Sequence, residues 1–235
     1  SHRKLLYTMY KMGLLKGQKI KSANIVGQTM QLNPHGDASI YETMVRLTRG
    51  NEALLHPFID SKGSFGKQYS RDMAYAASRY TEAKLDSICT ELFRDIDCDA
   101  VDMVDNFDGT MKEPVLLPVT FPSILANTNL GIAVGMASSI CSFNLREICE
   151  TTIGLIKNPD FDVMETLKAP DFIGGFCNIT QDIFIFPITM SFNFMTWNIG
   201  EPQIYQLQNC RDLRTACFIK IWKNVLLCHF NGLSS

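Results

Sequence analysis

Several common sequence features are absent from this chain of 235 residues. None of its eight cysteines forms a Cys-x-x-Cys pair or has the spacing of a zinc site. There is no signal peptide at the start, and no apolar run approaches the roughly 20 residues that a bilayer-spanning helix needs. These absences argue against a disulfide scaffold, a zinc module and a membrane protein. We therefore expect reduced thiols, a cytoplasmic location and no membrane partner.

Acidic residues are also missing from the N-terminal segment, since none occurs before Asp37. Six basic residues do occur there, namely Arg3, Lys4, Lys11, Lys16, Lys19 and Lys21. Residues 1–94 hold 14 Lys and Arg against 8 Asp and Glu, whereas residues 95–176 hold 4 against 13. A basic N-terminal part is what a phosphate backbone attracts, although a solvated lysine-rich helix face has the same composition. The acidic block would repel DNA, so we expect contact on one surface only.

Apolar residues at helical spacing predict helices over residues 2–15, 19–32 and 145–157, and another that begins with Asp37 as its cap. Pro34 ends the second helix, because the residue before a proline avoids the helical region. Two helices joined by a short turn form a helix-turn-helix pattern, although an unrelated helical hairpin has the same periodicity. Residues 60–66 indicate a turn-rich loop or wing, and residues 101–109 and 115–119 indicate short strands.

The segment 75–85 carries the most chemistry. Apolar residues from Thr81 onward predict a helix with Thr81 as its N-cap; they are Leu85, Ile88, Cys89, Leu92 and Ile96. Tyr80 would then lie just outside a helix N-terminus, which favours a bound anion, and Arg79 would add a cation suited to phosphate. Nearby positive charge helps a phenol to act as the nucleophilic phenolate. The alternative is an ordinary half-buried tyrosine beside a solvated arginine.

Seven ordered segments resemble the type IIA DNA topoisomerase A subunit, the family of DNA gyrase A and topoisomerase IV A. The first is AYAASRYTEAKL at 74–85, which is similar to the active-site motif of that family. The others are HRKLLYTMYKMG at 2–13, KSANIVG at 21–27, NPHGDASIYETMVRL at 33–47, DSKGSFG at 60–66, VDMVDNFDGT at 101–110 and LGIAVGMASSI at 130–140. Together they identify the chain as a member of this family over nearly all of residues 2–175.

The resemblance implies an α+β fold in which a winged-helix (helix-turn-helix) DNA cleavage domain occupies residues 1–109. The start of a mixed, β-rich tower domain would follow over residues 110–176. Residues 177–235 resemble no segment of the family, and we interpret them as an unrelated replacement or as translation in a shifted reading frame. Because the chain begins at Ser1 without a methionine, we expect an N-terminal breakage-reunion fragment.

The resemblance also implies an activity, that of an ATP-dependent type II topoisomerase, an isomerase. Tyr80 would attack a DNA strand and form a 5′-phosphotyrosyl link, with Arg79 and Arg3 stabilising the phosphate and His35 assisting. Mg²⁺ and ATP would be held by a partner B subunit, so neither a metal nor a cofactor is expected on this chain. The implied partners are double-stranded DNA, a second copy of the A chain in an A2B2 assembly, and the B subunit, at the bacterial nucleoid.

The residues expected to bind or adjoin DNA are Lys4, Lys21, Ala38, Ser39, Glu42 and Ile140. Lys4 replaces an arginine of the family and loses bidentate phosphate geometry. Asn33 replaces a histidine and cannot carry a proton's charge. Ala38 replaces the serine that, with the acid at Glu42, anchors quinolone drugs, so we expect weak quinolone sensitivity. Ile140, the wedge between base pairs, lacks the diproline that normally follows it.

Two alternatives remain open on the sequence. The chain could be a non-catalytic winged-helix module that binds duplex DNA without cutting it, or a decayed remnant with no function. Most of the tower, the exit gate and the C-terminal wrapping domain of the family have no counterpart here. Full strand passage by this chain alone is therefore not expected.

Overall fold

The structure is a computed structural model that describes residues 1–134, 136–167, 169–173, 175–176, 195–196 and 203–204. The chain divides into two compact units, residues 1–184 and residues 185–235. In the second unit the described residues form one antiparallel pair, β12 (Met195–Thr196) with β13 (Gln203–Ile204). The rest of the predicted non-homologous tail beyond residue 176 lies outside the described residues, and that interpretation stays a prediction.

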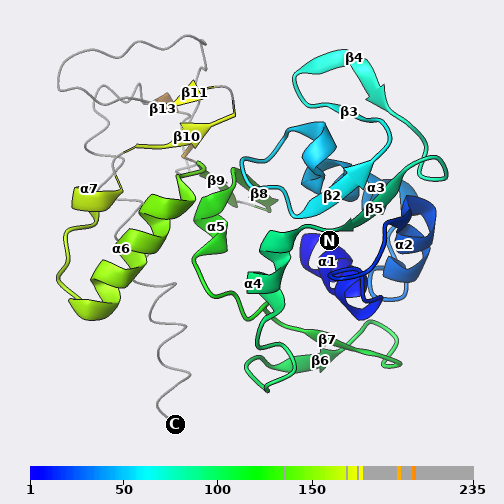
Figure 1. The fold of residues 1–235 in the computed structure, drawn as a ribbon, viewed down its shortest axis with the longest axis horizontal. Helices are drawn as coiled ribbons and strands as arrows, with labels where there is room; N and C mark the ends of the chain where they lie inside the picture. Colours follow the sequence, from blue (N-terminus) through cyan, green and yellow to red (C-terminus); the bar gives the residue numbers. More distant parts are fainter. Residues whose placement is uncertain (135, 168, 174, 177–194, 197–202, 205–235) are drawn as a thin grey trace. The chain divides into compact units, whose positions relative to one another are not determined.

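Three helices open the first unit and pack on one core: α1 (His2–Lys11), α2 (Ser22–Thr29) and α3 (Asp37–Leu47) (Figure 1). Each presents an apolar stripe to that core, as its spacing predicts. The fully buried apolar members of these stripes are Leu5, Met9, Ile25, Ile40, Met44 and Leu47. The helices predicted in this region therefore exist, with shorter bounds than expected.

Two details of these helices differ from the prediction. The second helix begins at Ser22 because residues 20–21 are a strand, β1 (Ile20–Lys21). The cap of α3 is Gly36, and Asp37 is the first helical residue, whose carboxylate accepts a hydrogen bond from the backbone N–H of Ala38 at 2.9 Å. An acid in the first turn still suits the positive end of the helix dipole.

A three-stranded antiparallel sheet in the order β1-β5-β2 packs beside these helices. Strand β5 (Glu82–Leu85) pairs with β1 on one side and with β2 (Ile59–Lys62) on the other. Alternate residues face the core, so that Ala83 and Leu85 are buried while Glu82 is only partly so. Glu82 stands opposite Lys21 on β1 and Lys62 on β2, which gives the outer face a cross-strand row of charges.

The predicted helix from Thr81 to Ile96 is wrong. Residues 82–85 are strand β5, followed by a 3-10 helix η2 (Ser87–Cys89) and the short helix α4 (Thr90–Phe93). Thr81 therefore caps no helix. The apolar positions chosen from the sequence are nevertheless in the core, because a strand and two short helices deliver them to the same side; Leu85, Cys89, Leu92 and Ile96 are all buried.

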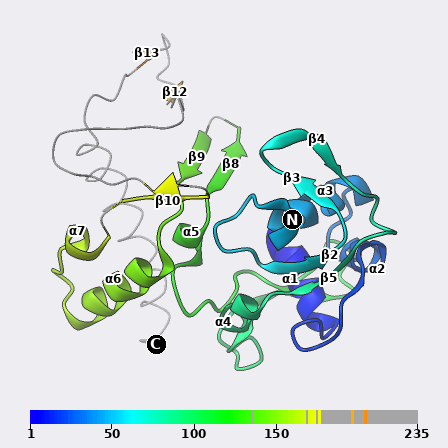
Figure 2. The ribbon, with the colours of Figure 1, turned by 45° about the horizontal axis from the view of Figure 1, so that its top comes forward.

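The turn-rich prediction for residues 60–66 is also incomplete, since these residues contribute to strands β2 and β3 (Phe65–Lys67) around a turn at Gly63. Strand β3 pairs with β4 (Ser70–Tyr75) in a hairpin that lies beside α3 in Figure 2. A 3-10 helix, η1 (Arg49–Asn51), supports the hairpin, because the Asn51 amide donates to the Phe65 carbonyl at 3.0 Å.

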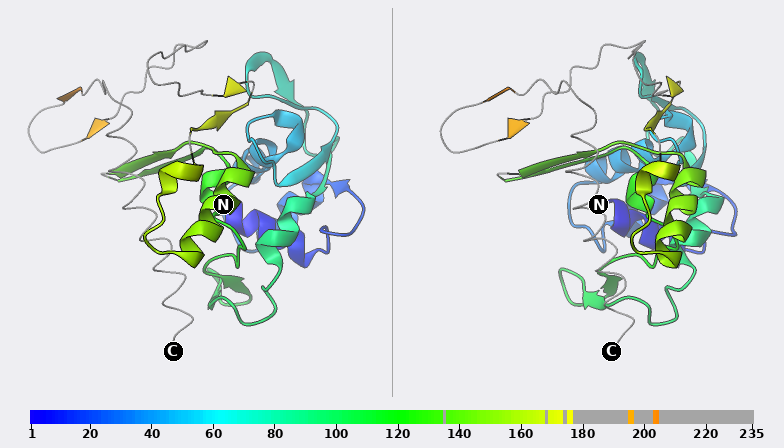
Figure 3. Two further views of the ribbon diagram at one scale, coloured as in Figure 1. Left: turned by 60° about the vertical axis from the view of Figure 1, so that its left-hand side comes forward. Right: turned by 90° about the vertical axis from the view of Figure 1, so that its left-hand side faces the viewer.

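Among the described residues, the remainder of the first unit contains short elements and three further hairpins. The hairpins are β6 (Met103–Asp105) with β7 (Lys112–Pro114), β8 (Asn129–Ala133) with β9 (Met136–Ile140), and β10 (Asp171–Phe172) with β11 (Gly175–Phe176). In Figure 3 the green pair β8–β9 forms a narrow two-stranded ribbon. The predicted strand at 101–109 is confirmed by β6, but the strand at 115–119 is wrong, because the partner of β6 is residues 112–114.

Helices α5 (Ser123–Ala126), α6 (Leu145–Lys157) and α7 (Val163–Thr166) complete the described elements. The bounds of α6 match the predicted helix at 145–157, and the side chain of Asn144 caps it by accepting from the N–H of Arg146. The mixture of helices with small antiparallel sheets confirms the α+β class. In the described ranges, none of the helices has the length and apolar character needed to cross a bilayer.

Candidate functional site

Tyr80 lies in a turn, residues 78–80, that connects β4 to β5. Its side chain is 65% exposed, and the guanidinium carbon of Arg79 lies 4.7 Å from the centre of its ring. Within the described part of the chain, no hydrogen bond engages the Tyr80 hydroxyl. The tyrosine is therefore not half-buried, and its phenol is open to solvent beside a cation.

The helix N-terminus expected next to Tyr80 belongs to α2 and not to a helix that follows it. The first amides of α2 point at the turn, where Ser22 N–H donates to the Thr81 carbonyl at 3.0 Å and Ala23 N–H donates to the Ser78 carbonyl at 3.1 Å. These amides already have acceptors. The anion site predicted from helix geometry at residue 81 is thus wrong, while the positive end of α2 still faces the turn.

Buried hydroxyl groups hold the turn from the other side. Thr81 Oγ1 donates to Ser22 Oγ at 2.8 Å and lies 3.0 Å from Tyr41 Oη. Tyr41 Oη, on α3, donates to the Ala76 carbonyl at 2.7 Å. Thr81 and Ser22 are fully buried, and Tyr41 is nearly so. Burial raises the pKa of Tyr41, which keeps its hydroxyl protonated as a donor.

Exposed lysines flank the turn on the outer face of the sheet. Lys21 Nζ lies 2.9 Å from the carboxylate of Glu82, and Lys62 Nζ lies 3.8 Å from the same group. The hydrogen bond from Lys21 lowers the pKa of Glu82. A third lysine, Lys19, pairs with Asp60 at 2.9 Å. With Lys84, which stands opposite Asp60 on the same face, the row contains four lysines and two acids, so it carries a net positive charge.

Arg3 and Lys4 are only partly buried, and both are bonded to other groups of the chain. The Lys4 ammonium donates to the Leu32 carbonyl at 2.7 Å and lies 3.1 Å from the carboxylate of Glu113. The Arg3 guanidinium donates to the carbonyl of Val115, and its Nε is buried with no hydrogen-bond partner among the described residues. No contact in the described ranges joins either side chain to Tyr80. Their predicted phosphate roles remain predictions.

The predicted residues of α3 share one accessible surface. Ala38, Ser39 and Glu42 are all exposed, and Ala38 and Glu42 lie one helical turn apart. His35 is exposed in the turn that precedes this helix. Arg46, which was not predicted, is exposed one turn beyond Glu42. Its spacing of four residues from Glu42 could have indicated that it lies on the same face of the helix.

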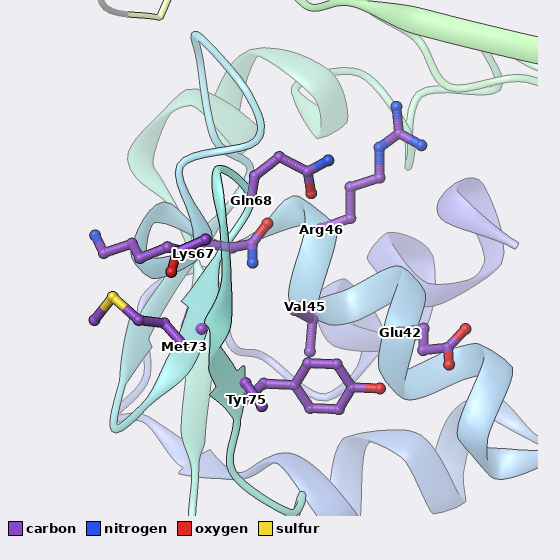
Figure 4. Close-up of a pocket in the computed structure, with 11 residues that line it drawn as sticks. Glu42, Val45, Arg46, Lys67, Gln68, Met73 and Tyr75 are labelled. Atoms are coloured by element: carbon purple, nitrogen blue, oxygen red, sulfur yellow. The ribbon is translucent and has the colours of Figure 1, made fainter.

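An open groove runs between α3 and the β3–β4 hairpin (Figure 4). Val45 and Tyr75 form part of its apolar lining, while Arg46 and Gln68 contribute polar groups. The ring of Tyr75 packs edge-on against the ring of Tyr41 at 5.5 Å between centroids. The sequence did not indicate this groove, because a loop or wing was predicted only for residues 60–66, whereas the hairpin wall is formed by residues 66–75.

Ile140 is the last residue of β9 and pairs with Asn129 on β8. Its side chain is partly exposed. The structure places it at the end of the two-stranded ribbon, with no contact to the Tyr80 turn among the residues described. Those same residues contain no group of three or more His, Cys, Asp or Glu arranged to hold a metal ion.

The chain is similar to known proteins over most of its length. The family model for the A subunit of DNA gyrase/topoisomerase IV matches residues 1–186. The chain is 45% identical over 176 residues to the DNA gyrase A subunit of Staphylococcus aureus strain NCTC 8325 / PS 47, covering 73% of this chain and 20% of that protein. It is 44% identical over 176 residues to the DNA gyrase A subunit of Staphylococcus epidermidis strain ATCC 12228, covering 73% of this chain and 19% of the relative. The chain thus spans about a fifth of the length of these relatives.

Proposed function

The chain belongs to the family of DNA gyrase and topoisomerase IV A subunits, and on that premise we propose that it binds duplex DNA and breaks and rejoins a strand through Tyr80. The observation that carries the proposal is the exposed phenol of Tyr80 with the Arg79 guanidinium at 4.7 Å, on a turn fixed by two helices. The reaction class is that of a type II topoisomerase, an isomerase.

The proposed step is a transesterification. The Tyr80 hydroxyl gives its proton to water, and its oxygen attacks a backbone phosphorus. A bond forms between the Tyr80 oxygen and the 5′-phosphate, the bond from phosphorus to the 3′ oxygen breaks, and the 3′ oxygen takes a proton from water. The released 3′ hydroxyl can reverse the step, which rejoins the strand. Arg79 stabilises the negative charge that develops on the phosphate, with Arg3 and His35 as further candidates. The described residues supply no evident acid for the 3′ oxygen.

The fold supports a winged-helix assignment for residues 1–109. Helices α2 and α3 supply the helix-turn-helix, α3 presents an exposed polar face for the major groove, and the β3–β4 hairpin is the wing. Residues 110–176 would then begin the tower domain, where Ile140 is proposed to wedge between base pairs. Lys21, Ser39 and Glu42 are proposed to face the duplex.

The partners are proposed by analogy with the family. A B subunit would hold the Mg²⁺ ions and hydrolyse ATP, and two A chains would each cut one strand in an A2B2 assembly. Divalent ions would stabilise the leaving 3′ oxygen. The assembly would work at the bacterial nucleoid in the cytoplasm.

A second function is favoured by the engagement of Arg3 and Lys4. Because Lys4 is paired with Glu113 and Arg3 is bonded to Val115, two of the expected phosphate contacts are occupied internally. The chain would then be a winged-helix module that binds DNA without cutting it.

One experiment separates these functions. The chain is incubated with the B subunit of a staphylococcal relative, Mg²⁺ and supercoiled DNA, and covalent complexes are trapped with detergent. We expect linear and nicked DNA bound to protein, and none with Tyr80→Phe, which keeps the ring but lacks the nucleophile. Arg79→Gln should lower the yield about tenfold or more, whereas Arg94→Gln, which removes only the exposed pair with Glu91, should not. Salt-sensitive DNA binding without any covalent product would support the module.

A further inference from the structure

The position of Tyr80 is set by the backbone that carries it, because its exposed side chain has no hydrogen bond of its own within the described ranges. The flanking residues are different. Thr81, directly after the turn, is fully buried, and Ala76, two residues before the turn, accepts a hydrogen bond at its carbonyl from Tyr41. Backbone bonds from the Ser22 and Ala23 N–H groups to the Thr81 and Ser78 carbonyls tie the two ends of the turn to α2.

We propose that Thr81, Tyr41 and Ser22 are positioning residues for the Tyr80 nucleophile. The inference rests on the proposed function. Attack on phosphorus needs the phenol oxygen within about 3–3.5 Å of its target and in line with the leaving oxygen, and a small misplacement costs a large part of the rate. A turn that is tied at both ends by directional bonds holds such a geometry with few alternative backbone states.

The use of hydroxyl groups at these sites is itself informative. A buried hydroxyl that loses its hydrogen-bond partner costs free energy. These residues therefore favour one backbone conformation of the turn over alternative conformations more strongly than hydrocarbon contacts would. Gly63 closes the remaining side of Thr81: a Cβ at this glycine would lie 3.3 Å from Thr81 Cγ2, and its φ is +106°. The Thr81 side chain is thus enclosed by Ser22, Tyr41 and Gly63.

The three hydroxyls also connect the nucleophile to the surface proposed to bind DNA. Ser22 is the first residue of α2, and Tyr41 lies on α3 next to the exposed Glu42. Helices α2 and α3 would bind the duplex, and the same two helices hold the backbone around Tyr80. The bound DNA and Tyr80 would therefore keep a fixed position relative to each other. Binding and positioning should be separable, since Thr81 and Tyr41 are buried and offer almost no surface to a duplex.

The test compares Thr81→Val, Tyr41→Phe and the conservative Thr81→Ser. With the B subunit, Mg²⁺ and saturating DNA, the single-turnover rate of covalent complex formation should fall about tenfold or more in Thr81→Val and Tyr41→Phe, while the Kd for DNA changes less than about twofold. Thr81→Ser should retain the rate within about threefold. The double variant should be little slower than the slower single variant, since the residues act in one cluster.

A second measurement needs no DNA. Trypsin cuts after Arg79, so native-state nicking at this bond reports the freedom of the turn, with cutting after Arg94 as the internal reference. Thr81→Val and Tyr41→Phe should each speed the nicking at Arg79 several-fold and leave that at Arg94 unchanged.

These measurements distinguish two failures. Faster nicking without covalent product in any protein, wild type included, would leave the positioning cluster standing and refute the proposed function. A wild-type rate of covalent complex formation in Thr81→Val, or unchanged nicking in both variants, would overturn the positioning role. Should Thr81→Val fail to fold, as judged by circular dichroism, Tyr41→Phe decides the question alone.

Discussion

The Lys4 ammonium on α1 lies 3.1 Å from the carboxylate of Glu113 on β7, and the two side chains are 23% and 9% exposed. The pair therefore joins the first helix of the core to a hairpin far along the chain. It also places a lysine that the family resemblance assigns to DNA in an internal contact. Whether Lys4 serves stability or DNA binding can be measured.

Removal of the Glu113 charge should destabilise the protein. In Glu113→Gln the part-buried Lys4 ammonium loses its counter-charge, and we expect a loss of about 1–3 kcal/mol in the free energy of unfolding. The matched control is Asp105→Asn on the neighbouring strand, whose pair with Lys112 is mostly exposed and should be worth less than about 1 kcal/mol. Urea denaturation followed by circular dichroism measures both. Equal effects of the two substitutions would contradict the structural role.

The salt dependence of DNA binding separates internal lysines from those that meet phosphate. Each lost phosphate contact reduces the slope of log K against log salt concentration by about 0.9. Lys21 is 55% exposed beside the Tyr80 turn, so Lys21→Gln should reduce the slope by about that amount. Lys4→Gln should change it much less, because Glu113 and the Leu32 carbonyl already hold Lys4. A larger change for Lys4 than for Lys21 would restore its predicted role at the DNA.

Glycine substitutions test the β3–β4 hairpin. Gly66 has a φ of +65°, and a Cβ there would lie 2.5 Å from the Met73 carbonyl oxygen, so Gly66→Ala should cost about 2 kcal/mol or more. Gly109 has a φ of +70° but no described atom within 4 Å of such a Cβ, so Gly109→Ala should cost only about 1 kcal/mol. Gly27 lies in the middle of α2 and has the same open surroundings in the described structure. Gly27→Ala should therefore raise the free energy of unfolding by up to about 1 kcal/mol. Urea melts rank the three, and any other order would show the hairpin or helix to be misassigned.

The sequence located the core residues of 81–96 correctly and their secondary structure wrongly. Leu85, Cys89 and Leu92 fit a helical stripe, but Thr81, Ala83 and Leu85 also alternate with the polar Glu82 and Lys84, which is the pattern of a strand. Over so short a segment the helical and strand periodicities fit the same residues, so the local pattern could not distinguish a helix from a strand. The partners β1 and β2, distant in sequence, decided the outcome in favour of a strand.

The choice of Tyr80 as the candidate nucleophile came from the family motif and not from the local geometry. The exposed tyrosine and its arginine are present, yet the reason first given for them, a helix N-terminus at Thr81, does not exist. The contact of the Ser22 and Tyr41 hydroxyl groups with Thr81 could not be predicted from the sequence, since neither residue lies near Tyr80 in the chain. By contrast α6 was predicted to the residue, because it is amphipathic and capped by Asn144.

The stability of the protein should depend on pH through Asp86. Burial would raise the pKa of this carboxyl, but hydrogen bonds from Arg49, the Ile88 N–H and the Ser87 hydroxyl outweigh it, and the net pKa is lowered. A lowered folded-state pKa means that the carboxylate stabilises the fold above its unfolded pKa of about 3.9 and that this contribution is lost as the pH falls further. The difference in unfolding free energy between wild type and Asp86→Asn should therefore be constant down to about pH 4 and shrink below it.

The control for this titration is the same comparison in an Arg49→Gln background. There the strongest hydrogen bond that lowers the folded-state pKa is gone, so this pKa rises toward the unfolded value and the pH-dependent part of the difference should become smaller. Guanidinium-induced unfolding between neutral pH and about pH 3 supplies the data. A wild-type difference that stays constant across the whole range would show that Asp86 is not the titrating group.

The exposed face of α3 should bind quinolone drugs weakly. The family resemblance implies that a serine and an acid one turn apart hold these drugs through a water–metal bridge, and this chain presents Ala38 and Glu42 at those places, both exposed. Because Ala38 has no hydroxyl, one anchor is missing. The loss of one hydrogen bond should therefore weaken drug binding by roughly 1 kcal/mol, which is about a fivefold increase in Kd.

Restoring the hydroxyl tests this loss directly. Ala38→Ser should raise drug-stabilised cleavage at a fixed quinolone concentration, whereas Ala38→Ser combined with Glu42→Gln should not, because the second anchor is then gone. Thr43→Ala removes another hydroxyl of α3, whose bond is to the Ser39 carbonyl, and serves as the control for a general effect on the helix. If Ala38→Ser leaves drug-stabilised cleavage unchanged, the exposed face of α3 does not hold the drug in this chain.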